Sequence, residues 1–484
     1  MPVRTGKQYI EGLSKNPAEV WISGEKVKDV TTHTAFQNGV RSLASLYDQQ
    51  HDPATKDSMT FESPSSGDPV GLSFIIPKTI DDLVRRREMM TNWAWESCGM
   101  MARTPDFLNN AVSSWAGSAD YFADDRPEFK DNVLRYHEYI RENDLTLTHT
   151  LVNLQRSRNT AIHDNIEDQV ALTVVDETAQ GIVVHGSRIL ATLGPISDEI
   201  AVYPTRTHIL GKDAWRQAFS FALPCNTPGM RFMCRESLDL GRSSFDHPLG
   251  ARFEEMDALV FFDNVLVPWE RVFLLGDVEM CNAYAAATQS TAHTGQQVVN
   301  RTAVKTEFML GLTSLMAETL GSTEVPHVQE RIGEIVVYLE TLKACVRAAE
   351  ADAKLNQWGV MCPAQGPLIA GRNLYSRMIY ARLAEIVQLL GSSNLMALPT
   401  EADFDTLVAP ELERYLTTDT TGAKDRVRLF HLAWDVACSA FGGRQVLYER
   451  FFGGDPVRNA MLLYQSYDKT NAMDRVQRFL EREG

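Results

Sequence analysis

The spacing of apolar residues changes twice along the chain, and this order of patterns limits the possible folds more than any other feature of the sequence. Across residues 34–140 apolar residues recur at helical spacing, as in segment 79–96, where Thr79 is suited to cap the helix. Residues 170–267 instead hold short β-branched and aromatic runs bounded by Gly, Pro, Asn and Asp. Beyond residue 275 long helical patterns return, which is typical of a helical bundle. We therefore predict a mainly α protein with a central antiparallel β-domain, divided into an N-terminal helical domain (1–145), a β-domain (146–275) and a C-terminal helical bundle with a tail (276–484).

The individual elements follow from the same patterns. The predicted strands span residues 170–175, 181–191, 218–223, 230–234 and 258–267, with a hairpin loop at 177–181, a turn at 263–264 and a short extended piece at 70–76. The predicted bundle helices span residues 292–320, 325–354, 371–391, 409–416, 426–441 and 473–483. No internal repeat is present, so we expect one site per chain, where the three units meet.

Composition excludes several kinds of partner. The net charge of -16 argues against nucleic acid or an anionic membrane surface, because no basic patch offsets it. No run of 18 apolar residues is present, so we expect no transmembrane helix. The N-terminal segment 1–7 lacks the apolar core of a secretion signal, and we expect a cytoplasmic protein.

The cysteines and glycines exclude several cofactors. The seven cysteines lie far apart, without a second Cys or a His at metal-ligand spacing, which argues for free thiols and against a zinc site or an iron-sulfur cluster. Neither Gly-x-Gly-x-x-Gly nor a Walker motif occurs, so a nicotinamide or nucleoside triphosphate site is not expected within this chain.

Two segments each place one polar group that can engage an oxyanion inside an apolar stretch. In segment 99–108, Thr104, Pro105 and Asp106 read as the first positions of a helix, so Arg103 should lie at the helix's positive end, where an anion is favoured. In segment 145–151, alternation places His149 on the leucine face, pointing inward. Together they predict a buried site for a phenolate oxygen. The structural alternatives are a surface or salt-bridged arginine and a core histidine with its hydrogen bonds satisfied.

Both segments also carry a resemblance, which continues through motifs in the same order along nearly the whole chain. These motifs are Arg4-Thr-Gly-Lys-Gln-Tyr9, Val30-Thr-Thr-His33, Phe245-Asp-His-Pro248, Val267-Pro-Trp-Glu-Arg271, Gln445-Val-Leu-Tyr-Glu-Arg-Phe451 and Gly454-Asp-Pro-Val-Arg458. In them the chain resembles the 4-hydroxyphenylacetate 3-hydroxylase family, the large oxygenase components of two-component aromatic hydroxylases. The resemblance implies an acyl-CoA dehydrogenase-like architecture and a homotetramer. It also implies FAD supplied as FADH2 by a separate flavin reductase, O2 as co-substrate, and ortho-hydroxylation of a phenol, 4-hydroxyphenylacetate to 3,4-dihydroxyphenylacetate or a close analogue.

The resemblance assigns roles at the phenol. Arg103 and His149 match the family's donors to the phenol oxygen, whereas Phe107 stands where hydroxyphenylacetate members have a tyrosine. Loss of that donor would weaken oxyanion stabilisation by roughly 1–3 kcal/mol if nothing replaced it. His293 falls where branches acting on chlorinated and nitrated phenols use a catalytic histidine, and its alternative is a polar residue at a helix interface. Thr205 and Arg206 correspond to the loop that reads the substrate's tail and would hold a carboxylate; the alternative is an exposed arginine on a loop.

The resemblance also assigns flavin contacts to seven residues: Gln155, Arg158, Thr192, Arg444, Gly454, Asp455 and Arg458. At Gly454–Arg458 and at Arg444 the structural alternative is a helix cap beside a surface charge.

Three other functions stay open. The first is a halophenol or nitrophenol hydroxylase on the same scaffold, which Phe107 and His293 favour. A 4-hydroxybutyryl-CoA dehydratase-like or acyl-CoA dehydrogenase-like enzyme is disfavoured, because Ala102 and Asn300 stand where cluster-ligating cysteines would follow Cys98 and His293, and no catalytic carboxylate is apparent. A non-catalytic acidic scaffold would show no affinity for flavin.

Overall fold

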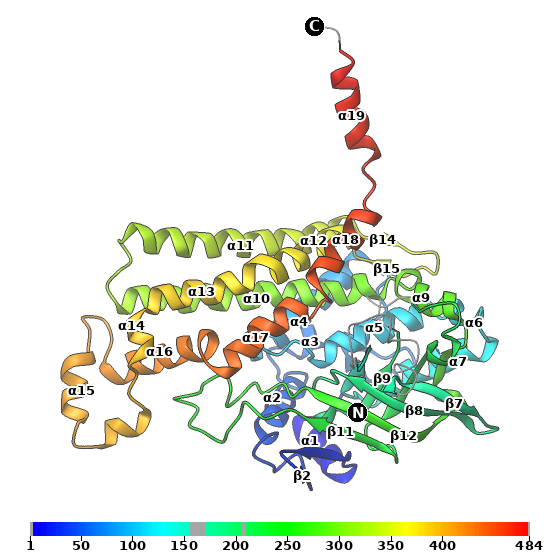
Figure 1. Ribbon diagram of the computed structural model, residues 1–484, viewed down its shortest axis with the longest axis horizontal. Coiled ribbons are helices and arrows are strands. Elements are labelled where there is room, and N and C mark those ends of the chain that lie inside the picture. The colour runs from blue at the N-terminus through cyan, green and yellow to red at the C-terminus, as the bar shows by residue number, and fades with distance from the viewer. Residues whose placement is uncertain (1–2, 155–169, 205–209, 483–484) are drawn as a thin grey trace.

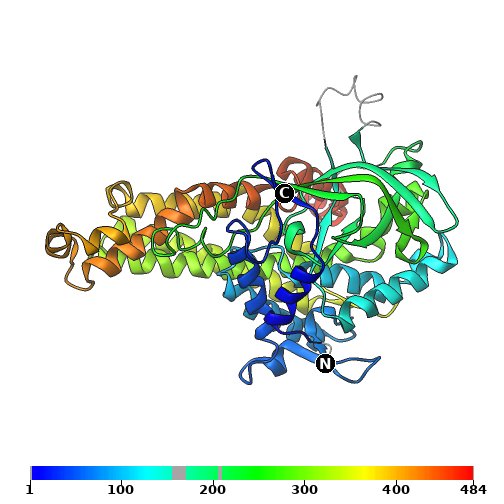
Figure 2. The ribbon, with the colours of Figure 1, turned by 90° about the horizontal axis from the view of Figure 1, so that it is seen from below.

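The computed structural model describes residues 3–154, 170–204 and 210–482, and these form three packed units. Helices of the N-terminal unit and the β-domain lie side by side against one flank of the long C-terminal bundle, and the last helix projects away from all three (Figures 1 and 2). This is the predicted order of a helical unit, a β-domain and a bundle.

The N-terminal unit is helical, with two short strands. Its helices are α1 (Gly6–Lys15), α2 (Gln37–Asp48), α3 (Lys56–Met59), α4 (Ile80–Glu96), α5 (Pro105–Gly117), α6 (Asp120–Ala123) and α7 (Pro127–Glu142), and its strands are β3 (Thr60–Glu62) and β4 (Pro69–Gly71). Thr79 caps α4 as predicted, since its hydroxyl accepts from the Asp82 amide at 3.1 Å and the Asp82 carboxylate accepts from the Thr79 amide at 3.0 Å. The predicted extended piece at 70–76 continues β4 only to Gly71 and then becomes a short 3-10 turn.

The β-domain consists of two sheets. The first has the order β2-β1-β11-β12-β8-β6 with β7 also on β8, and the second has the order β13-β10-β9-β5. The strands are β1 (Val20–Ile22), β2 (Glu25–Lys26), β5 (Leu147–Thr150), β6 (Val152–Asn153), β7 (Thr173–Glu177), β8 (Gly181–Ile189), β9 (Glu199–Val202), β10 (Phe219–Pro224), β11 (Met230–Cys234), β12 (Ala258–Pro268) and β13 (Val272–Leu275).

Three predictions for this domain need correction. The domain is not purely antiparallel, because β1 pairs in parallel with β11 and β5 pairs in parallel with β9. Its first sheet includes two strands from the N-terminal unit, so the sheet crosses the predicted boundary at residue 145. Asp263–Asn264 is not a turn between strands but a bulge inside β12, where the pairing with β8 shifts and Asn264 takes φ 51°.

The C-terminal unit is the predicted helical bundle with more interruptions. Its helices are α9 (Val278–Ala287), α10 (Ser290–Thr319), α11 (Pro326–Ala351), α12 (Gln365–Leu374), α13 (Tyr380–Gly391), α14 (Ser393–Met396), α15 (Ala409–Leu416), α16 (Ala423–Ala437), α17 (Ala440–Phe451), α18 (Pro456–Ser466) and α19 (Thr470–Leu480). The expected single helix 371–391 contains a π-helical segment at Tyr375–Ile379. The expected helix 426–441 ends at Ala437, because Ser439 caps a new helix by accepting from the Gly442 amide.

Helix α5 lies where the three units meet. It contacts α10 of the bundle, α7 of its own unit and β5 of the β-domain, and nearly all its residues are buried. Side chains at its beginning are therefore shielded from solvent by all three units.

Candidate active site

Arg103 lies at the start of α5, one residue before the N-cap Thr104, as predicted. Thr104 takes an extended conformation and Pro105 is the first helical residue. The anion at this helix terminus is a residue of the chain itself: Glu255 Oε1 accepts from the backbone amides of Ala102 and Arg103 at 2.8 and 2.6 Å. These two backbone amides are thus already paired with Glu255, whereas the guanidinium of Arg103 can still bind a ligand.

The Arg103 guanidinium packs against two aromatic rings that lie at an angle to each other. Its Cζ lies 4.2 Å from the centre of Phe107 and 3.9 Å from the centre of Phe452. Burial lowers the pKa of Arg103, yet an arginine stays charged in a protein. Its Nη1 is buried and has no hydrogen-bond partner among the described residues. A buried donor without an acceptor is what a ligand oxyanion would satisfy.

His149 approaches the same aromatic ring from the β-domain. Strand β5 holds it, its ring centre lies 5.5 Å from that of Phe107, and its side chain is buried, as predicted. Its Nδ1 has no partner among the described residues. Burial, with a smaller contribution from Arg103, holds its pKa well below the usual value, so the imidazole is neutral. The residue is therefore not a core histidine with satisfied hydrogen bonds.

The opposite face of β5 is buried as well. Thr148 and Thr150 donate to the carbonyl oxygens of Thr192 and Ile189, at 2.7 and 3.1 Å. These bonds fix the face of the strand opposite His149 and so fix the direction in which His149 points.

Two tyrosines near these groups were missed from the sequence. The Tyr203 ring lies 5.7 Å from His149, and the Tyr448 ring lies 5.0 Å from Phe452. The Tyr448 hydroxyl is buried and unpartnered among the described residues, and burial raises its pKa well above the usual value. Tyr448 lies one helical turn before Phe452 in a quoted motif, but only the fold brings both beside Arg103.

His293 lies on α10 and forms the helix-interface contact named as its alternative. Arg86 Nη2 lies 3.0 Å from its Nδ1 and 2.7 Å from Gln296 Oε1. Because a guanidinium only donates, Nδ1 accepts and the proton of neutral His293 lies on Nε2, which is buried without a partner among the described residues. One turn later, Gln297 Nε2 lies 3.4 Å from both Thr104 Oγ1 and Asp106 Oδ1 at the start of α5. No direct contact joins His293 to Arg103, Phe107 or His149 within the described part of the chain.

Two predicted flavin contacts are tied to one carboxylate. The Thr192 hydroxyl donates to Asp257 Oδ1 at 2.9 Å, and Arg444 binds both oxygens of Asp257 and Glu255 Oε2. Although burial would raise it, Arg444 and Arg235 hold the pKa of Asp257 at about 2. The guanidinium of Arg444 therefore already has anionic partners, and because its side chain is only 11% exposed it is not the surface charge named as its alternative.

The segment Gly454–Arg458 is also a helix cap. Gly454 has φ 95°, and the Asp455 side chain caps α18 by accepting from the Arg458 amide at 2.9 Å. The Arg458 side chain is exposed. The other predicted contacts, Gln155, Arg158, Thr205 and Arg206, lie outside the described residues.

Other kinds of site are absent from the described ranges. No group of His, Cys, Asp and Glu side chains there could hold a metal ion, and none of the helices there is long and apolar enough to cross a membrane.

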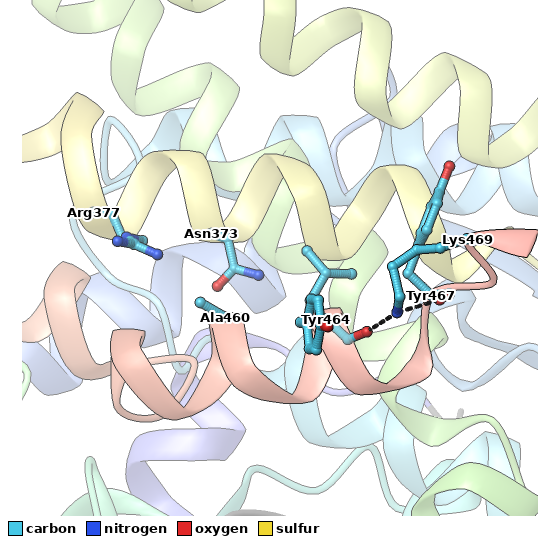
Figure 3. Close-up of a pocket in the computed structure, with 7 residues that line it drawn as sticks. Asn373, Arg377, Ala460, Tyr464, Tyr467 and Lys469 are labelled. Carbon is cyan, nitrogen blue, oxygen red and sulfur yellow. Dashed lines mark hydrogen bonds between the residues drawn. The ribbon is translucent and has the colours of Figure 1, made fainter. Parts of the chain in front are cut away.

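A pocket of about 360 Å³ lies between α12 and α18, lined by Asn373, Arg377, Ala460, Leu463, Tyr464, Tyr467 and Lys469 (Figure 3). It contains none of the predicted site residues.

Comparison with known proteins finds relatives that match nearly the whole chain. The family models described as 4-hydroxyphenylacetate 3-hydroxylase N terminal and C terminal match residues 5–274 and 281–481. The 4-hydroxyphenylacetate 3-monooxygenase oxygenase component of Geobacillus sp. (strain PA-9) is 47% identical over 99% of this chain and 97% of that protein.

Solved structures place the fold in the same group. The oxygenase component of a 4-hydroxyphenylacetate 3-monooxygenase, complexed with FAD and 4-hydroxyphenylacetate, has a TM-score of 0.94 and 47% identity, covering 99% of this chain and 98% of that one. A glutaryl-coenzyme A dehydrogenase has a TM-score of 0.52 at 13% identity, covering 81% and 84%, so the acyl-CoA dehydrogenase-like fold is confirmed. Since the family models match nearly the whole length, the chain belongs to the 4-hydroxyphenylacetate 3-hydroxylase family.

Proposed function

We propose that this chain is an oxygenase that uses FADH2 and O2 to hydroxylate a phenol at the ortho position, with 4-hydroxyphenylacetate or a close analogue as substrate. The observation that carries the proposal is a pair of buried nitrogens, Arg103 Nη1 and His149 Nδ1, that have no partner among the described residues, come from different units and flank Phe107. One phenol oxygen between them would satisfy both groups.

The residues around Phe107 fit a phenol bound beside a flavin. The guanidinium of Arg103 favours the ionised form of the phenol, and neutral His149 donates an N–H to the same oxygen. An ionised phenol pushes electron density onto its ortho carbon, which makes that carbon the better nucleophile. Phe107 and Phe452 keep water away from the guanidinium. Reduced flavin, when bound, supplies the electrons that activate O2.

Flavin would be held by residues at the edge of this aromatic cluster. Thr192 lies next to β5 through the Thr148 hydrogen bond, and the Tyr448 hydroxyl, which has no partner in the described ranges, suits the polar edge of a ring system. Gln155, Arg158, Gly454, Asp455 and Arg458 remain proposed flavin contacts, and Thr205 and Arg206 remain proposed contacts to the substrate's carboxylate. The chain has no dinucleotide-binding motif, so a separate flavin reductase would supply FADH2.

A chlorinated or nitrated phenol is the second candidate substrate. His293 carries a buried N–H without an acceptor in the described part of the chain, and it lies one turn from Gln297, which contacts the start of α5. This N–H is available to replace the donor that Phe107 lacks. For such a phenol, His293 would be the third donor to the phenol oxygen.

We further propose a homotetramer in the cytoplasm. On α19, Met473, Val476, Phe479 and Leu480 form one apolar stripe, each between 61% and 75% exposed, and no residue of α19 is buried. The helix stands away from the body of its own chain (Figure 1), so another molecule has to cover the stripe. Residues 469–482 hold four Lys or Arg and two Asp or Glu in a chain of net charge -16, which favours a second copy as partner. All seven cysteines are free, which supports the reducing environment of the cytoplasm.

The function is tested by mixing the purified chain with reduced FAD, a phenol and 18O2, and analysing the product by mass spectrometry. We expect 4-hydroxyphenylacetate to give a catechol with one labelled oxygen. A panel with 4-nitrophenol and a chlorophenol ranks the substrates. FAD binding without labelled product from any phenol would contradict the proposal.

A further inference from the structure

The carboxylate of Glu255 joins all three units at the residue that would bind the phenol. Its side chain has no exposed surface. Oε1 accepts from the Ala102 and Arg103 amides at 2.8 and 2.6 Å, and Oε2 accepts from Arg444 Nη1 at 2.9 Å. Both oxygens are therefore engaged, one by the N-terminal unit and one by α17 of the bundle.

From Arg444 the connection continues to the proposed flavin side. Arg444 donates to Asp257 at 3.0 and 2.9 Å, in a two-pronged pair, and Asp257 accepts from the Thr192 hydroxyl at 2.9 Å. An unbroken series of hydrogen bonds thus runs from the backbone of Arg103 through Glu255, Arg444 and Asp257 to Thr192. It links a residue proposed to bind the phenol to one proposed to bind flavin.

Protein stability alone does not explain why charged residues form this series of hydrogen bonds. Burying charges costs desolvation energy, and apolar side chains of similar size often stabilise a protein equally well. Apolar side chains would, however, leave the two amides before α5 unpaired and leave the Arg103 backbone without a fixed position. A carboxylate with both oxygens engaged holds that backbone in one place.

We propose that Glu255 is a positioning residue for the hydroxylation, acting through Arg103. This inference rests on the proposed function. Glu255 sets the Arg103 backbone, and the side chain then places its guanidinium against Phe107 and Phe452, facing the phenol. Arg444 and Asp257 fix Glu255 relative to the flavin side.

A double-mutant cycle tests this, with phenol affinity measured by titrating the FAD-loaded protein with 4-hydroxyphenylacetate. We expect Glu255→Gln to weaken phenol binding about tenfold when Arg103 is present, and by less than about twofold in the Arg103→Met background. FAD affinity should stay within about twofold throughout. Glu255→Asp keeps the charge but is one methylene shorter, and it serves the same cycle if Glu255→Gln does not fold.

Glu254 provides the matched control. It is the preceding residue, is buried equally deeply, pairs with Arg235 and accepts from the Leu238 amide. We expect Glu254→Gln to lower the melting temperature as much as Glu255→Gln does but to leave phenol affinity unchanged. The inference is overturned if Glu255→Gln weakens binding equally in both Arg103 backgrounds, or if Glu254→Gln matches its effect. If the wild-type protein binds FAD but no phenol, the proposed function fails and this inference fails with it.

Discussion

At the scale of single residues, Phe107 is where the candidate site departs from the family pattern. Its ring contacts Arg103, His149 and Phe452 but has no group that donates a hydrogen bond. It therefore contributes shape and a cation-π contact, while oxyanion stabilisation is left to the neighbouring nitrogens.

Restoring the hydroxyl should strengthen phenol binding. We expect Phe107→Tyr to tighten binding of 4-hydroxyphenylacetate about tenfold, or about 1.4 kcal/mol, because a third donor would join Arg103 and His149. Titration of the FAD-loaded protein measures this. Phe107→Leu is the control: it removes the ring and should weaken binding. Equal or weaker binding by the tyrosine variant would mean that another group, such as His293, already occupies the third position.

Local rules predicted the places of Arg103 and His149 but not their partners. The Thr104-Pro105 helix start and the alternation of segment 145–151 are short-range patterns, and both are present in the structure. Glu255 lies 152 residues from Arg103, and Arg86 lies 207 residues from His293. No spacing rule connects residues so far apart, so the sequence could not show that the α5 terminus is already filled by a carboxylate.

At the scale of elements, the spacing of apolar residues predicted where helices and strands occur better than it predicted where they are interrupted. Asn264 has the positive φ of a turn residue, which a bulge within a strand can require equally, so turn and bulge look alike in sequence. The π-helical segment at Tyr375–Ile379 contains neither Gly nor Pro to mark it. Helix α18 was not predicted because Gly454–Arg458 was interpreted first as a set of flavin contacts and only alternatively as a helix cap, although Asp455 and Pro456 are a good helix start.

Helix α19 makes the oligomer testable at this scale. We expect Met473→Asp with Phe479→Asp to shift the protein from tetramer to smaller species, because charges would enter the proposed apolar contact. Light scattering after size-exclusion chromatography measures the mass. Asn471→Asp, on the opposite face of the helix, is the control and should remain tetrameric. A double variant with the wild-type mass would show that α19 does not hold the subunits together, and binding of α19 to lipid vesicles would point to a different partner.

At the scale of the whole molecule, the order of the three units was predictable because each has its own periodicity. The way in which the three units pack together was not predictable. Strand β1 of the N-terminal unit pairs with β11 across more than 200 residues, and α5 is covered by both of the other units. The candidate site depends on that packing, since Arg103, His149 and Phe452 come from three different units.

Buried neutral histidines should make stability depend on pH. His149 and His293 have pKa values well below 6.5 in the folded protein, mainly because of burial, but regain the usual value on unfolding. The unfolded chain therefore takes up protons first, and stability present above pH 6.5 is lost as the pH falls below it. Between pH 7.5 and 5.5, each histidine should lower the free energy of unfolding by about 1.4 kcal/mol.

His293→Gln tests this, because an amide oxygen can still accept from Arg86. We expect urea unfolding of the variant to lose about 1.4 kcal/mol less than wild type over that pH interval. The comparison is between the two pH slopes, so any loss of stability common to both pH values cancels. An unchanged pH slope would mean that His293 is protonated in the folded protein or that it is exposed to solvent there.

If Arg103 and His149 converge on one phenol oxygen, they stabilise its ionised form, so the ionisation of a bound phenol tests this arrangement directly. The absorbance of 4-nitrophenol bound to the FAD-loaded protein can be followed against pH. We predict that the bound phenol ionises at least about one pH unit lower than in water, and that Arg103→Met abolishes this shift and hydroxylation while FAD affinity stays within about twofold. A bound phenol that ionises as it does in water, or a shift that survives Arg103→Met, would contradict the account.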